Sequence, residues 1–183
     1  MKKHRRPSVG TPRRGTARPL VESLEQRILL SVVTWTGEGN GSFWSDPNNW
    51  STHALPTAGD DVVVSGNTTE DISALTVNNL SFSGNSSLTL ADDEGFPVSF
   101  TVGGNINVSG QVNIYTGAMH LSSDASTITT TATGDTLTWA PPYTVAGAKL
   151  TVAGPGTVIF GDAAFHSTPF TLNAETDVTS GRV

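Results

Sequence analysis

The chain has 183 residues, no cysteine and a net charge of −6. Without cysteine, disulfides, thiolate metal sites and thiol nucleophiles are excluded. No apolar run approaches the ~20 residues that span a bilayer, so we expect no membrane-spanning segment.

The charges divide the chain into two parts. Residues 1–30 hold eight Lys and Arg against two Glu, whereas the rest of the chain holds two basic and fourteen acidic side chains. We therefore expect a basic leader at residues 1–31 and one acidic domain at residues 32–183. Because phosphate is bound mainly by Lys and Arg, we expect no nucleic acid partner for this domain. A basic arm for nucleic acid or anionic lipid is one interpretation of residues 1–18, and an export signal is the favoured one.

The leader ends in a short amphipathic segment. Leu20, Leu24 and Ile28 recur every four positions, which predicts one short helix within residues 20–30. The Arg-, Pro- and Gly-rich stretch up to Pro19 is typical of disorder. A conventional signal peptide would need about 7–15 consecutive apolar residues, and this leader has none that long.

This amphipathic segment resembles the LEPR-XLL domain at the start of large exported bacterial proteins. Gln26 stands where that family has proline, and Ile28 occupies its variable position. The resemblance implies delivery to the cell surface or the extracellular space, with the export machinery as partner. The residues of this candidate targeting motif are Leu24, Glu25, Arg27, Leu29 and Leu30.

From residue 32 onwards, apolar residues alternate with polar ones in many short runs. A period of two is the signal of a β-strand with one buried face. Gly- and Asn-rich turns separate the runs, and few connections are long enough for a helix, so an all-β domain is predicted. Examples of the alternating pairs are Val62 and Val64, Leu88 and Leu90, Ile106 and Val108, Val112 and Ile114, Leu137 and Trp139, and Leu150 and Val152.

Two architectures fit this pattern, a β-sandwich and a right-handed parallel β-helix, or solenoid. The very short strands, the uneven spacing and the lack of paired alternating strands joined by Asn-Gly or Asp-Gly favour the solenoid. The sandwich remains the alternative.

Two stretches resemble autotransporter-type sequences. Residues 34–64 are similar to the opening unit of β-helical passenger regions, with a tryptophan strand, a W-x-x-x-x-x-W loop and a P-x-x-x-D turn. Residues 150–176 resemble the autotransporter-associated β-strand repeat, with Glu175 in place of its usual glycine. Both resemblances imply a β-helix.

Trp35, Trp44 and Trp50 cluster at the start of the domain. Exposed, they would form a platform for stacking sugar rings, and they are the candidate ligand-binding residues. Buried, they would cap the first coil, where an open solenoid would expose apolar side chains and strand edges. Their position favours the cap.

No residue pattern predicts a catalytic or metal site. Asp60 with Asp61, and Asp92, Asp93 and Glu94, lack the spacing of calcium loops and are expected to form solvated turns. The histidines are isolated, without the spacing of a metal motif, and no G-x-S-x-G elbow occurs. The histidines of the domain are His53, His120 and His166.

The sequence therefore predicts an exported, adhesin-like protein with a structural or adhesive role, no enzymatic activity and no cofactor. Its expected partner is a surface polysaccharide or another cell surface. The alternatives are a polysaccharide-acting β-helix, either lyase or glycoside hydrolase, and a carbohydrate-binding module. The absence of Lys and Arg from residues 62–145 counts against a lyase.

Overall fold

The computed structural model describes residues 31–115, 117–140, 143–145, 149–161 and 175–178. The leader with its predicted helix and targeting motif lies outside this part of the chain, as does His166. The first strand, β1 (Val32–Thr34), begins one residue after the expected end of the leader.

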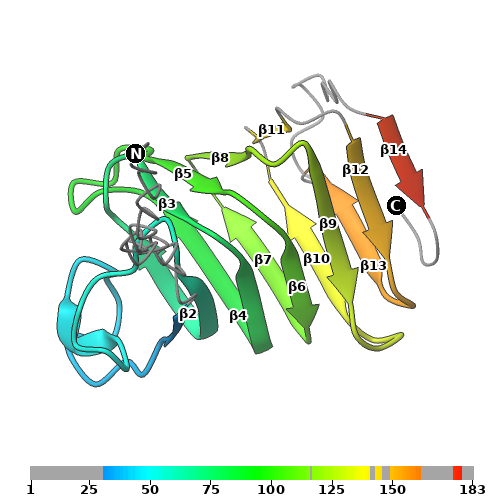
Figure 1. The fold of residues 1–183 in the computed structure, drawn as a ribbon. Helices are drawn as coiled ribbons and strands as arrows, with labels where there is room; N and C mark the ends of the chain where they lie inside the picture. The colour runs from blue at the N-terminus through cyan, green and yellow to red at the C-terminus, as the bar shows by residue number, and fades with distance from the viewer. Residues whose placement is uncertain (1–30, 116, 141–142, 146–148, 162–174, 179–183) are drawn as a thin grey trace, which may run out of the picture.

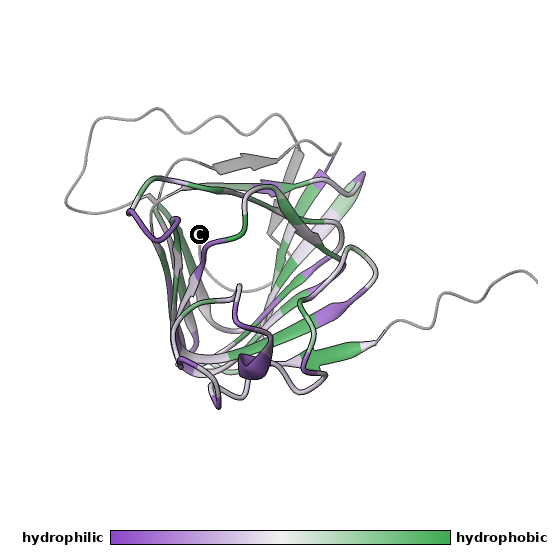
Figure 2. Ribbon diagram, turned by 90° about the vertical axis from the view of Figure 1, so that its left-hand side faces the viewer, coloured by the Kyte–Doolittle hydropathy of each residue, from purple (hydrophilic) through white to green (hydrophobic). Residues whose placement is uncertain are grey.

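The described chain forms a parallel β-solenoid of about 4 turns. Successive coils stack along one axis (Figure 1), and Figure 2 shows the ring of sheets viewed close to that axis. Every pair of named strands is parallel, and the only antiparallel contacts among the described residues are isolated bridges. The predicted all-β solenoid is thus confirmed, and the sandwich alternative, which needs antiparallel sheets, is wrong.

Each turn of the solenoid passes through three faces. The first face contains β1, the first half of β2 (Asp61–Glu70), the first half of β4 (Leu80–Leu90), β6 (Ile106–Ser109), β9 (Ala125–Thr130), β12 (Lys149–Ala153) and β14 (Glu175–Val178). The second face contains the second halves of β2 and β4, with β7 (Gln111–Tyr115), β10 (Thr136–Trp139) and β13 (Thr157–Phe160). The third face contains β3 (Leu75–Val77), β5 (Ser99–Val102), β8 (Ala118–Leu121) and β11 (Tyr143–Val145).

Two strands run through a corner without ending. β4 pairs with β6 through its first residues and with β7 through its last ones, and β2 pairs with β4 on both sides of a register shift. The bends lie at Gly66 and Gly84, whose φ values of 75° and 79° favour a residue without a Cβ. These glycines join the first and second faces into one continuous sheet.

The core consists of columns of side chains that run along the axis. Parallel pairing places residues of the same inward orientation above one another, so alternation along each strand becomes a stack between coils. A buried apolar side chain contributes roughly 1.5–3 kcal/mol, which makes these columns the main source of stability. One column on the first face comprises Val62, Leu80, Ile106, Ile128 and Val152, all of them buried.

Asparagine side chains connect successive coils at the corners. Asn79 accepts a hydrogen bond from the backbone N–H of Asn105 at 2.7 Å, and Asn105 in turn accepts one from Thr127 at 2.9 Å. At the next corner, Asn85 accepts from the backbone of Gln111 at 2.9 Å. These side chains satisfy N–H groups that lie beyond the regular strand pairing.

Asp135 has a similar role in the turn before β10. Its carboxylate accepts backbone N–H bonds from Thr131 and Ala132 in its own turn, and from Gly110 in the previous coil. The bond from Gly110, reinforced by those from Thr131 and Ala132, holds the pKa of Asp135 down at about 2 despite its burial. Asp135 therefore connects two neighbouring coils as an ionised group.

Candidate functional site

The three tryptophans that were the candidate ligand-binding residues lie inside the fold. Trp44 and Trp50 are completely buried and Trp35 is 7% exposed. The ring centroids of Trp35 and Trp50, and of Trp44 and Trp50, lie 5.0 Å apart in edge-to-face geometry. Trp44 also packs on Phe100 of β5 at 5.4 Å, which joins the cluster to the column of the third face. These rings cap the coils and offer almost no exposed surface to a sugar.

The cap is formed by residues 35–60, which cover the N-terminal end of the solenoid and are drawn in blue and cyan in Figure 1. The segment includes the 3-10 helix η1 (Pro47–Asn49). The side-chain oxygen of the buried Asn49 accepts hydrogen bonds from the backbone N–H groups of Gly39 and Gly41. Its side-chain NH₂ group donates hydrogen bonds to the side-chain oxygen of Asn40 and to the carbonyl of Phe43. One amide thus fixes the loop that carries Trp44.

A buried carboxyl group lies in the first coil, near the cap. Burial raises the pKa of Glu70 to about 8, and the negative charge of Asp71 adds to the rise. A hydrogen bond from the backbone N–H of Ile72, at 2.7 Å, lowers the pKa and offsets part of this effect. The second oxygen of Glu70 has no partner among the described residues, and neither have Trp44 Nε1 and Thr68 Oγ1. Glu70 is therefore protonated at neutral pH, and the sequence pattern had not singled it out.

The predicted acidic pair at residues 60–61 belongs to a structural turn. Asp60 accepts hydrogen bonds from Thr57 and from the hydroxyl of Ser31. Asp61 accepts from the side-chain amides of Asn78 and Asn79 at 2.8 Å each. Both carboxylates are engaged in holding the first turn of the solenoid.

Asp92, Asp93 and Glu94 lie together on the loop that follows β4. Each offers a carboxylate oxygen within 4.8 Å of the others, and Asp92 also accepts from the backbone of Phe96. A hydrogen bond with Asp93, together with its charge, raises the pKa of Glu94. Of the histidines that the structure describes, His53 is exposed in the cap segment and His120 is half-buried on β8.

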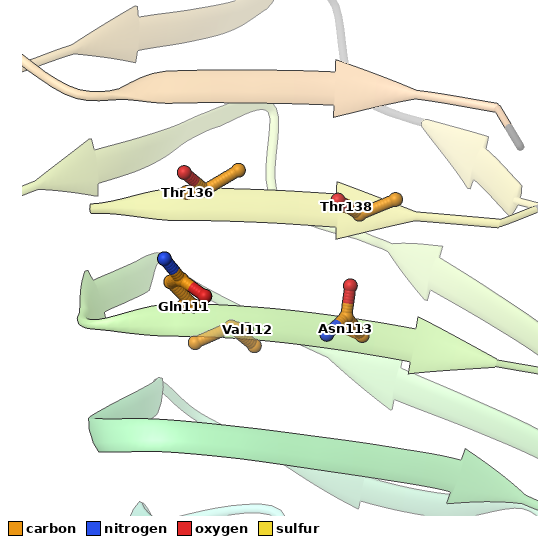
Figure 3. A pocket seen from close by; sticks show the side chains of 5 residues that line it. All are labelled: Gln111, Val112, Asn113, Thr136 and Thr138. Atoms are coloured by element: carbon orange, nitrogen blue, oxygen red, sulfur yellow. The ribbon is translucent and has the colours of Figure 1, made fainter. Parts of the chain in front are cut away.

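The outer surface of the second face carries a polar trough that the sequence analysis did not identify. Two adjoining hollows of about 260 and 360 Å³ share Gln111 and Asn113 of β7. Figure 3 shows these two side chains beside Thr136 and Thr138 of β10, to which they are paired in register. The remaining lining residues are Asn67, Asn85, Ser86, Ser87, Val112 and Tyr115.

The lining of this trough carries no Lys, Arg, His, Asp or Glu. Apart from Val112, its side chains are amides and hydroxyls, with the partly exposed ring of Tyr115 at one end of β7. The signal in the sequence was the set of polar residues at the outward positions of the alternating runs. Sequence alone could not show which of these positions lie side by side, because that depends on the register between coils.

No protein family model, no curated protein and no solved structure matches the chain. Within the described part of the chain, no helix is long and apolar enough to cross a membrane. The structure defines the class of architecture: a parallel β-solenoid with a capped N-terminal end and a trough of uncharged polar side chains on its second face.

Proposed function

We propose that this protein is an exported, non-catalytic module with a structural or adhesive role at the cell surface or outside the cell. The observation that carries the proposal is the continuous stack of parallel coils with a buried tryptophan cap at its first coil. Such a stack holds its outer faces at fixed positions along an axis, which suits a spacer or an adhesive surface.

Four acidic side chains that are engaged in the fold support this proposal over a polysaccharide-cleaving enzyme. A glycosidase needs two carboxyl groups that both face the substrate. Asp60, Asp61 and Asp135 instead accept hydrogen bonds within turns and between coils. Glu70 has the raised pKa expected of a general acid, but it is buried in the core.

The leader supplies the second part of the proposal. Its basic charge and its resemblance to the LEPR-XLL domain support a role in export. Deleting residues 1–30 should leave the thermal midpoint of the domain unchanged within about 2 °C, and should keep the protein inside the cell. Cell fractionation and thermal unfolding of the same variant test this. Normal delivery combined with a large fall in the midpoint would overturn the role of the leader.

Absence of catalysis is tested separately. The full chain, incubated with neutral and acidic polysaccharides, should release no new reducing ends and no unsaturated products. Steady release of either product, absent from a heat-denatured sample of the same protein, would establish the enzyme alternative.

A further inference from the structure

We infer that the trough on the second face binds a neutral, hydroxyl-rich polysaccharide chain that lies along the solenoid axis. This inference rests on the proposed adhesive function and gives it a target. It moves the binding site from the tryptophan cap at the N-terminal end to the outer surface of β4, β7 and β10.

The first argument is the chemistry of the lining. An amide side chain offers one acceptor and two donor hydrogens, which matches the mixed donors and acceptors of sugar hydroxyls. The amides of Gln111 and Asn113 have no hydrogen bond to any described residue, although the backbone N–H of Gln111 is taken by Asn85. At the centre of the trough, therefore, two amides keep their full capacity for a ligand.

The second argument is charge. A phosphate, sulfate or carboxylate ligand would need Lys or Arg beside it, and a cationic ligand would need Asp or Glu. The lining provides none of these. The domain that carries the trough is acidic, so an anionic polymer would also meet a repulsive field there. A neutral partner is the one that fits.

The third argument is direction and spacing. Asn67, Ser87, Asn113 and Thr138 occupy equivalent register positions on four neighbouring strands, which makes a row along the axis. Neighbouring strands lie about 4.8 Å apart, close to the length of one residue in an extended β-linked pyranose chain. A parallel row begins at Gln111 and Thr136. On β7 and β10, a sugar residue thus meets a pair of polar side chains at equivalent register positions, Gln111 with Asn113 and Thr136 with Thr138.

Tyr115 supplies an apolar contact at the margin of these rows. Its side chain is 45% exposed, and it follows Asn113 at the next outward position of β7. A phenol ring has an apolar face for the C–H surface of a sugar and a hydroxyl for its oxygens. Binding sites for small ligands commonly combine a few polar groups with such an aromatic contact.

The test is isothermal titration of the full chain with three neutral polymers, a mixed-linkage β-glucan, dextran and a galactomannan, and with alginate as the anionic comparison. We expect binding to at least one neutral polymer, unchanged between low and moderate salt, and no binding to alginate at moderate salt, where attraction to the basic leader is screened. A Gln111→Ala/Asn113→Ala variant should bind about tenfold more weakly or worse. Tyr115→Ala should also weaken binding.

Asn107→Ala is the matched control, because Asn107 is an outward-facing asparagine of the same coil on β6 of the first face. It should bind like the wild type, and all variants should keep the wild-type circular dichroism spectrum. Failure of all neutral polymers to bind would overturn the inference. So would equal affinity of the Gln111→Ala/Asn113→Ala variant, or binding confined to alginate and lost in salt.

The same titration samples separate this inference from the proposed function. If no polymer binds but deletion of the leader still blocks delivery, only the trough is refuted. If a polymer binds at the trough and is cleaved, the non-catalytic function is refuted while the site stands.

Discussion

Among single residues, the buried rings of the cap and the buried carboxyl group of Glu70 have the largest expected effects on the stability of the first coil. Trp44 and Trp50 have no exposed surface, and Trp50 Nε1 donates to the carbonyl of Trp44 at 2.9 Å. Their positions in the sequence were sufficient to predict the cap, since a solenoid must cover its first coil. Glu70 could not be predicted, because it lies at the end of an alternating run that reads as an ordinary strand.

Replacing Trp50 by alanine should lower the free energy of unfolding by roughly 3–5 kcal/mol, because it leaves a large cavity between Trp35 and Trp44. Urea denaturation followed by circular dichroism measures this loss. Tyr115→Ala removes an exposed ring and should change the free energy by less than about 0.5 kcal/mol. Equal effects of the two variants would place Trp50 outside the core.

Glu70 should make the protein less stable as the pH rises. Its pKa is raised from 4.5 in the unfolded chain to about 8 in the fold, so between these values the folded state binds more protons. The stability that Glu70 contributes is therefore fully present below about pH 4.5 and falls until about pH 8, by up to about 1.4 kcal/mol per pH unit.

The Glu70→Gln variant should lose this dependence and should be more stable than the wild type at pH 8. Denaturation curves at pH 5, 6.5 and 8 for both proteins provide the measurement. Glu38→Gln, at an exposed position of the cap segment, is the control and should follow the wild type. Parallel curves for wild type and Glu70→Gln would contradict the burial of a protonated carboxyl group.

At the scale of strands and turns, the fold depends on which residues the coils place above one another. Period-two alternation was enough to predict the strands, and the lack of hairpin turns was enough to prefer a solenoid. The corners were not predictable in the same way. Asn79 and Asn105 read as ordinary turn residues, yet their side chains bond to the next coil. Nothing local in a sequence encodes a partner some twenty residues away.

Asp135 offers a test of these contacts between coils. Asp135→Ala removes the acceptor of three backbone N–H groups, one of which belongs to Gly110 in the previous coil. We expect a loss of about 2 kcal/mol at neutral pH. Asp124→Ala, at an exposed position in the preceding coil segment, should be close to neutral.

The dependence of the unfolding free energy on pH in the acid range provides a second test of Asp135. Since the pKa of Asp135 falls to about 2 in the fold, its contribution is present above pH 3.8 and is lost as the pH drops towards 2. The difference between wild type and Asp135→Ala should therefore shrink between pH 4 and pH 2. A constant difference over this interval would show that the carboxylate is not the acceptor.

At the scale of the whole molecule, each coil contacts chiefly its neighbours along the axis. The strand pairs of all three faces join adjacent coils, so stability is close to a sum over coils and their interfaces. The trough has the same origin, since no single strand contains it. The sequence supplied its side chains, but the register between β4, β7 and β10 was needed to bring them together.

Hydrogen exchange should report this arrangement directly. In the Trp50→Ala variant, amide protection should fall most in β2, less in β4 and β6, and least in β10 and β13. Mass spectrometry of peptides from each strand resolves the gradient. A uniform fall along the chain would show that the solenoid unfolds as one cooperative unit instead of coil by coil.

The parallel stacking has a mechanical consequence. The hydrogen bonds between coils point along the axis, so a pull between the two ends of the solenoid loads them in tension, one interface after another. The stretch from Ser81 to Asn107 spans 26 residues in sequence, but it advances the solenoid by about 4.8 Å. Unwound, 26 residues extend to about 90 Å. A tether built this way yields in steps under load and dissipates work with each coil that it releases.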